Sequence, residues 1–156
     1  MDRLESIREI VDHIISKIQD QTTRKFAYIH TYGVSQNCAL LALRRHVDIE
    51  LACIAGMLHD IAVYANNCPY SVHAKQSAIL AKEILEKSDV FEPDEILIIT
   101  NAIALHSNKM EKDGGKLSEL LKDADVLQHH LYNTNIEPSA KDKYRLFYIL
   151  EELEMQ

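Results

Sequence analysis

The residues best suited to chemistry are an adjacent histidine and aspartate, His59-Asp60, near the end of a long apolar stretch. The stretch runs from residue 51 to residue 64, with the sequence LACIAGMLHDIAVY, and has the length of a helix. A helix that is apolar on all sides is normally buried in the middle of a fold. Burying an ionised carboxylate beside an imidazole is costly unless something compensates the charge. A metal ion is the simplest compensation, so we expect His59-Asp60 to belong to a metal site.

Polar residues near the apolar positions of other predicted helices are candidates to join this pair. In chain order they are His30, His73, His106 and Asp125. Each is weak evidence alone, because a histidine such as His30 is more often a hydrogen-bonded core residue, and His73 is equally well explained as an exposed residue at a helix start. The ordered set of H, HD, H, H and D on successive helices is far more specific. Periodicity indicates that these residues face inward, but it does not show that they converge.

The candidate ligands also indicate which metals would bind. Histidine and carboxylate without thiolate suit Fe, Mn, Co or Ni better than a structural zinc site. One or two divalent ions lower the pKa of bound water, polarise a phosphoryl oxygen and stabilise charge on the leaving group. No protein nucleophile is then needed, and the sequence has no Gly-rich phosphate loop. We therefore predict one or two divalent ions, with iron or manganese first and cobalt, nickel or magnesium as alternatives.

Apolar residues at helical spacing predict an all-α, single-domain bundle of about six to seven helices that positions these candidates. The expected helices cover about residues 3–20, 22–45, 51–64, 71–85, 92–106, 117–132 and 141–153. Thr22 or Thr23, Asp48 and Ser71 are the expected caps of the second, third and fourth of these helices. We expect one domain over residues 1–156, with a core at about 20–132 and a flanking helix at each end.

Composition excludes several classes of protein. Apolar residues make up 47% of the chain and the net charge is −7, which argues against a nucleic-acid binder with a basic face. The three cysteines are odd in number and form no C-x-x-C motif, which favours reduced thiols in a cytoplasmic protein. The first residues, MDRLESIREI, do not resemble a signal peptide, and no run of 18 apolar residues predicts a membrane span.

The ordered set resembles the HD-domain superfamily of metal-dependent phosphohydrolases, over roughly residues 20–132. The segments that carry the resemblance are YIHTYGV at His30, AGMLHDIA at His59-Asp60 and KDADVLQH at Asp125. In that family the residues H…HD…D hold a divalent metal inside an all-α bundle. The resemblance therefore implies an HD-domain fold and a hydrolase that uses metal-activated water.

Two further segments, SVHAKQSA at His73 and AIALHSNK at His106, resemble the dinuclear branch of this family. With H-x-x-G-V, they look most like the bacterial HD hydrolases that cleave diadenosine tetraphosphate, in which Asp60 would be the bridging carboxylate. The chain departs from other branches, because HD is followed by Ile-Ala-Val rather than a Gly-Lys pair, and no Gly-Tyr-Pro signature is present. Activity on cyclic di-GMP is therefore disfavoured.

Beside the metal ligands His59 and Asp60, we expect His129 to take part in catalysis as a residue behind Asp125 or as a proton donor. The lysines that are candidates for contact with substrate are Lys75, Lys109 and Lys122. The polar segment 107–116 is either a solvated connection or a lid whose lysines meet phosphates.

Three functions are compatible with this sequence. The first is a phosphohydrolase for a nucleotide or other small phosphoester, and we expect neither nucleic acid nor membrane as partner. The second is a di-iron oxygenase, because a minority of HD proteins use the same six ligands for that chemistry. The third is a catalytically silent HD module that binds a ligand, against which the complete set of six residues argues. A homo-oligomer is compatible with each.

Overall fold

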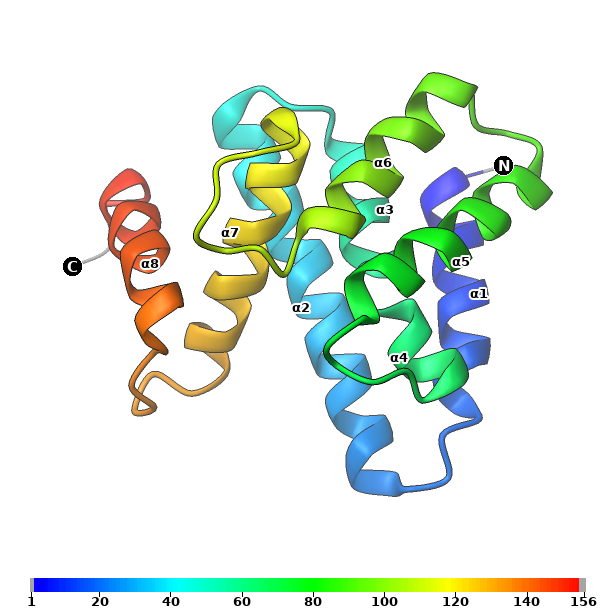
Figure 1. The fold of residues 1–156 in the computed structure, drawn as a ribbon, viewed down its shortest axis with the longest axis horizontal. Helices are drawn as coiled ribbons and strands as arrows, with labels where there is room; N and C mark the ends of the chain where they lie inside the picture. Colours follow the sequence, from blue (N-terminus) through cyan, green and yellow to red (C-terminus); the bar gives the residue numbers. More distant parts are fainter. Residues whose placement is uncertain (1, 155–156) are drawn as a thin grey trace.

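The computed structural model describes residues 2–154, and its regular secondary structure is helical throughout this part of the chain (Figure 1). The helices are α1 (Arg3–Ser16), α2 (Gln21–Arg45), α3 (Ile49–Leu58), α4 (Ile61–Asn66), α5 (His73–Ser88), α6 (Pro93–Leu105), α7 (Gly115–Tyr132) and α8 (Ala140–Glu152). The prediction of an all-α, single-domain fold is confirmed.

Helices α2 and α3 form the centre of the bundle. Every residue of α3 from Leu51 to Leu58 is buried, as its apolar sequence predicts. The two helices approach closely at Gly56, where a Cβ atom would lie only 2.7 Å from the Cα atom of Ser35. The hydroxyl of Ser35 donates a hydrogen bond to the carbonyl of Cys53 at 3.0 Å. This close contact fixes α3, and the histidine that follows it, against α2.

The expected single helix at residues 51–64 is divided at His59-Asp60 into α3 and α4. His59 keeps helical angles, but Asp60 has φ −113° and ψ 16°, outside the helical geometry. Asp60 precedes α4, and its side chain makes no capping hydrogen bond there. The carboxylate is therefore left for other partners. At the other end of α3, the expected cap is confirmed, since Asp48 Oδ1 accepts from the Leu51 amide at 2.9 Å.

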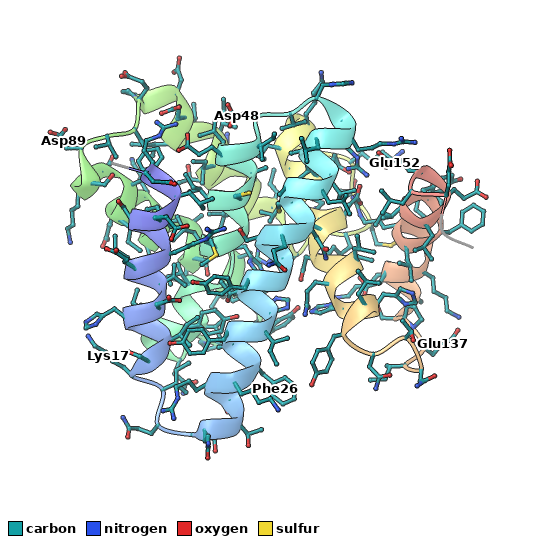
Figure 2. The ribbon with its side chains drawn as sticks, turned by 180° about the vertical axis from the view of Figure 1, so that it is seen from behind. Lys17, Phe26, Asp48, Asp89, Glu137 and Glu152 are labelled. Atoms are coloured by element: carbon teal, nitrogen blue, oxygen red, sulfur yellow. The ribbon has the colours of Figure 1, made fainter. Side chains whose placement is uncertain are left out.

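The remaining helices surround this centre. Helix α1 covers α3 on one side, and Figure 2 shows it running beside α2, with Lys17 at the turn between them. Helices α5 and α6 pack on each other, and α7 lies between α2 and α8 (Figure 1). Helix α8 packs on α7 at the edge of the molecule. Within residues 2–154, no helix is both long and apolar enough to cross a lipid bilayer.

Two expected caps are wrong. Asp20, rather than Thr22 or Thr23, caps α2, and its Oδ2 accepts from the Thr23 amide at 2.6 Å. A carboxylate is favoured at this position because it also complements the positive end of the helix dipole. Val72, rather than Ser71, precedes α5, and no side chain caps that helix.

Candidate metal centre

The six predicted ligands converge where α2, the α3–α4 junction, α5, α6 and α7 meet. Four imidazoles are arranged as two facing pairs. The Nε2 atoms of His30 and His59 are 3.0 Å apart, and those of His73 and His106 are 3.1 Å apart. Three of the rings are buried, and His30 is partly buried.

The Asp60 carboxylate lies between the two pairs. Its Oδ2 atom is 3.4 Å from Nε2 of both His30 and His59. Its Oδ1 atom is 3.3 Å from Nε2 of both His73 and His106. We call His30, His59, Asp125 and Oδ2 of Asp60 the His30 half, and His73, His106 and Oδ1 of Asp60 the His73 half. Each half receives one oxygen of the same carboxylate.

Asp125 completes the His30 half. Its Oδ1 atom lies 3.4 Å from Nε2 of His30. His59 and Asp125, with His30, form one group whose ligand atoms all lie within 4.8 Å of one another, and His59, Asp60 and His106 form a second such group. The two halves are therefore adjacent.

The hydrogen bond made by Nδ1 of each imidazole determines whether Nε2 carries a hydrogen. The acceptors facing the four Nδ1 atoms are Gln128 Oε1 for His30 (2.6 Å), Gly56 O for His59 (2.7 Å), Tyr70 O for His73 (2.5 Å) and Ile103 O for His106 (2.7 Å). An oxygen acceptor requires Nδ1 to carry the hydrogen, so each neutral ring presents a lone pair on Nε2. In this tautomer the Nε2 lone pair of a neutral ring is available to bind a metal.

The spacing of the ligand atoms fits divalent cations. Two ligands about 2.1 Å from one ion, at tetrahedral or octahedral angles, lie roughly 3.0–3.4 Å apart. The nitrogen and oxygen atoms of each half show these separations. Asp60 Oδ1 and Asp125 Oδ1 are buried and find no hydrogen-bond partner within residues 2–154. A buried carboxylate oxygen without a partner is costly, and a cation in each half would remove that cost.

Electrostatics keep the carboxylates ionised. Burial opposes charge on Asp60, but His59 and the other imidazoles hold the pKa of its carboxyl well below the usual range. Burial likewise opposes charge on Asp125, and Lys109 and His30 lower its pKa. Burial also disfavours protonation of His59, yet Asp60 and Asp125 raise its pKa to about 9. Burial lowers the pKa of His106. The His30 half thus attracts positive charge strongly.

Two aromatic rings flank the ligands. His129 is 52% exposed, and its ring stacks on His30 with the centroids 5.0 Å apart. Its Nε2 atom is 3.6 Å from Asp125 Oδ1, so it lies beside the cluster. Tyr70 is exposed and stacks on His73 with a centroid distance of 4.2 Å. The sequence did not suggest Tyr70, because one tyrosine in a loop carries no spacing signal.

The three candidate lysines differ in position. Lys109 is buried, and its Nζ lies 2.6 Å from Asp125 Oδ2, so it contacts a ligand. Lys75 is exposed on α5, two residues after His73. Lys122 lies on α7 and is fully buried.

The environment of Lys122 argues against contact with substrate. Its ammonium donates to the Glu111 carbonyl at 2.8 Å, to Glu119 Oε1 at 3.0 Å and to Asp113. Three acceptors use its three hydrogens, and none belongs to the cluster. Lys122 is therefore not available to contact substrate, because its ammonium holds the segment between α6 and α7.

Gln128 and Gly33 support the site, and of the two only Gly33 was noted in the sequence, as part of the segment H-x-x-G-V. Gln128 accepts the hydrogen bond from His30 Nδ1. A Cβ atom on Gly33 would lie 2.8 Å from Cγ of Gln128, so only glycine leaves room for this side chain. Gln128 lies three residues after Asp125, and this helical spacing was the signal that could have found it.

The family model described as HD domain matches residues 27–141. The chain belongs to the HD-domain family. The matched residues include the His59-Asp60 pair at the α3–α4 junction.

A solved structure agrees in fold. It is the crystal structure of a protein described as a predicted HD superfamily hydrolase from an uncultured Thermotogales bacterium. The TM-score is 0.65 at 22% sequence identity, with 99% of this chain and 92% of that chain covered. No match was found among curated proteins. HD-family membership, with imidazoles and carboxylates grouped as metal ligands, supports a metal-dependent hydrolase.

Proposed function

We propose that this HD-domain protein is a dinuclear, metal-dependent phosphohydrolase. The observation that carries the proposal is the position of Asp60, whose two oxygens each face a separate pair of imidazoles. A single metal would leave one pair of lone pairs facing each other without a cation. His30, His59 and Asp125 would hold one ion, His73 and His106 the other, and Asp60 both. Iron and manganese suit these ligands best.

The metals would supply an activated water and positive charge for the phosphoryl oxygens. The protein side chains then have to orient the ester and accept a proton. His129 is the candidate for the second task, because it is exposed beside Asp125. Burial of the other half of the ring lowers its pKa, although Asp125 opposes this effect, so at neutral pH the ring is neutral and accepts a proton rather than donating one as the sequence suggested.

A nucleotide is the substrate that the surroundings favour. Tyr70 and His129 present aromatic rings beside opposite halves of the centre, stacked on His73 and His30 respectively. Planar rings of this kind bind nucleobases by stacking. Of the three candidate lysines only Lys75 is exposed, and it stays a candidate for an outer phosphate, although a residue two positions after His73 lies on another face of α5. The specific resemblance to diadenosine tetraphosphate hydrolases makes dinucleoside polyphosphates the first compounds to test.

The test begins with metal-free protein, loaded separately with Fe²⁺ or Mn²⁺ without oxygen. We expect about two ions per chain and release of phosphate from at least one ester of a nucleotide panel. Asp60→Ala should lose both the metals and the activity, whereas Asp94→Ala, an exposed carboxylate on α6, should keep both. Full activity of Asp60→Ala would overturn the mechanism.

The same panel separates the other two functions. The six-ligand set is also that of a di-iron oxygenase, and oxygen consumption by partly reduced iron protein with a polyol or phosphonate, without phosphate release, would favour that chemistry. Tight nucleotide binding by the metal-free protein, with no turnover in any metal form, would instead indicate a ligand-binding module.

A further inference from the structure

Lys109 connects the two halves of the metal centre to the segment that follows α6. It is 7% exposed, and its ammonium donates to Asp125 Oδ2 at 2.6 Å and to the carbonyl of His106. A buried ammonium is stable only where it is paired and hydrogen-bonded. Here its partners are a side chain of the His30 half and the backbone of the His73 half.

The contact with Lys109 determines how Asp125 is turned. Oδ2 is bound to the lysine, while Oδ1 is buried, has no hydrogen-bond partner in residues 2–154 and faces His30 Nε2 at 3.4 Å. The lysine therefore selects the oxygen that is offered to a metal. Without it, rotation of the carboxylate about its last bond would be free to withdraw that oxygen.

The segment 106–114 that carries Lys109 depends on polar contacts. Its largest apolar side chain, Met110, is 71% exposed, so apolar packing does not hold it there. Instead, Arg145 of α8 donates from Nε to the carbonyl of Lys109 at 2.6 Å and from Nη2 to the carbonyl of Glu111 at 2.9 Å. The rigid fork of a guanidinium fixes two successive points of the segment in this way.

Arg145 is itself firmly held. It is buried, and its Nη1 atom lies 2.9 Å from both Glu119 and Asp123 on α7. The chain of contacts therefore runs from α7 and α8 through Arg145 to the Lys109 backbone, and through the Lys109 side chain to Asp125.

We propose that Arg145 and Lys109 are positioning residues that hold Asp125 in its metal-binding orientation, so that α8, which carries none of the six ligands, sets the metal affinity of the His30 half. This inference rests on the metal centre of the proposed function. It predicts that a change in α8 alters the metal affinity of the His30 half and leaves that of the His73 half nearly unchanged, because Lys109 contacts the His73 half only through the backbone carbonyl of His106.

Arg45 provides a matched control. It also joins α8 to the bundle, through Glu152 at 2.7 Å, and it pairs with the same Asp123 at 2.8 Å. Its hydrogen bonds go to Glu152 and not to the segment that carries Lys109. Loss of Arg45 thus also weakens the attachment of α8, but it leaves the hydrogen bonds from Arg145 to the carbonyls of Lys109 and Glu111 in place.

The experiment is a calorimetric titration of metal-free full-length protein with Co²⁺, combined with the visible absorption of bound cobalt. In His106→Gln only the His30 half keeps all its ligands, which identifies the binding event of that half. We expect Arg145→Met and Lys109→Met each to weaken it by about tenfold and to alter the cobalt spectrum. The double variant should lose no more cobalt affinity in the His30 half than either single variant. The dissociation constant of the His73 half should change by less than about twofold in each variant. Both dissociation constants of Arg45→Met should also stay within about twofold of the wild-type values.

Three results would each overturn the inference. The first is an equal loss of cobalt affinity in Arg45→Met and Arg145→Met, and the second is an additive loss in the double variant. The third is an unchanged cobalt affinity in Arg145→Met and Lys109→Met. Arg145→Lys keeps the charge but not the fork, and it serves where the methionine variant does not fold; it should show an intermediate loss. Wild-type protein that binds no divalent metal would end both proposals. Wild-type protein that binds cobalt but hydrolyses no ester would contradict the proposed phosphohydrolase function alone. The positioning of Asp125 would still be tested by comparing the cobalt affinities of the Arg145 and Arg45 variants.

Discussion

The two halves of the metal centre are built from the same kind of imidazole pair but differ in the number of their carboxylate ligands. The His30 half has a carboxylate of its own, Asp125, besides its oxygen of Asp60. The His73 half has only its oxygen of Asp60 as an anionic ligand among the described residues. The pKa of His59 is raised by the nearby carboxylates, whereas burial lowers the pKa of His106.

This difference assigns the two halves separate roles. The additional ligand Asp125 makes the His30 half the tighter site, although the ammonium of Lys109 offsets part of the charge of that carboxylate. We expect this half to fill first and to retain its ion during purification. The His73 half has three protein ligands, which leaves more coordination positions for water or substrate. Variants that change one half alone test whether the two halves differ in metal affinity in this way.

The largest effect is expected from His106→Gln. It removes one of three ligands of the His73 half, so bound metal should fall from about two ions to one per chain. The remaining ion should show the affinity of the tighter wild-type site. Metal analysis after gel filtration measures the stoichiometry, and loss of both ions would show that the halves are not separable.

Asp125→Asn should act on the other half. The variant removes a direct ligand, so its effect should exceed the upper end of the range for indirect partners, about 100-fold in dissociation constant. The site formed by His73 and His106 should change little. Titration with Mn²⁺ measures both values, with Asp142→Asn at the start of α8 as a carboxylate control. Weakening of the His73 half alone would contradict the assignment of Asp125.

The two halves should also respond differently to pH. In metal-free protein His59 holds a proton up to about pH 9, and a metal must displace it. Affinity of the His30 half should therefore rise by about tenfold per pH unit between pH 7 and pH 9 and level off above, because one proton is exchanged. His106, with its lowered pKa, is already neutral in that range. Titrations of His106→Gln with Mn²⁺ in buffers of different ionisation enthalpy count the protons released.

A smaller effect is expected from Gln128→Leu. The variant removes the acceptor for His30 Nδ1 and frees the tautomer and rotation of that ring, which should weaken the His30 half by about tenfold. Gly33→Ala should follow in the same direction, because its methyl group displaces Gln128. Gln36→Leu, one helical turn further along α2, is a control that should leave Mn²⁺ affinity unchanged.

The sequence predicted the fold well, because long helices with apolar stripes have few alternatives. It did not predict the break at His59-Asp60, since no glycine or proline marks it and the apolar run continues through Tyr64. The break comes from tertiary contacts, in which Asp60 turns toward four imidazoles rather than capping α4.

The site was only partly predictable for a similar reason. Histidines and carboxylates on successive helices could be listed from spacing, but which lysine reaches them depends on how helices rotate in the bundle. Lys109 and Lys122 look alike in the sequence, yet one contacts Asp125 and the other contacts Asp113 and Glu119. Arg145 lies outside every motif, so its position could not be inferred.

The shared carboxylate of Asp60 has a thermodynamic consequence. One negative charge serves two cations, so occupancy of one half reduces the charge available to the other, and the two ions also repel each other. The two binding steps should therefore be negatively cooperative beyond their intrinsic difference. Linkage requires the penalty to be reciprocal, so the factor by which the ion at His30 weakens binding at His73 equals the factor in the opposite direction.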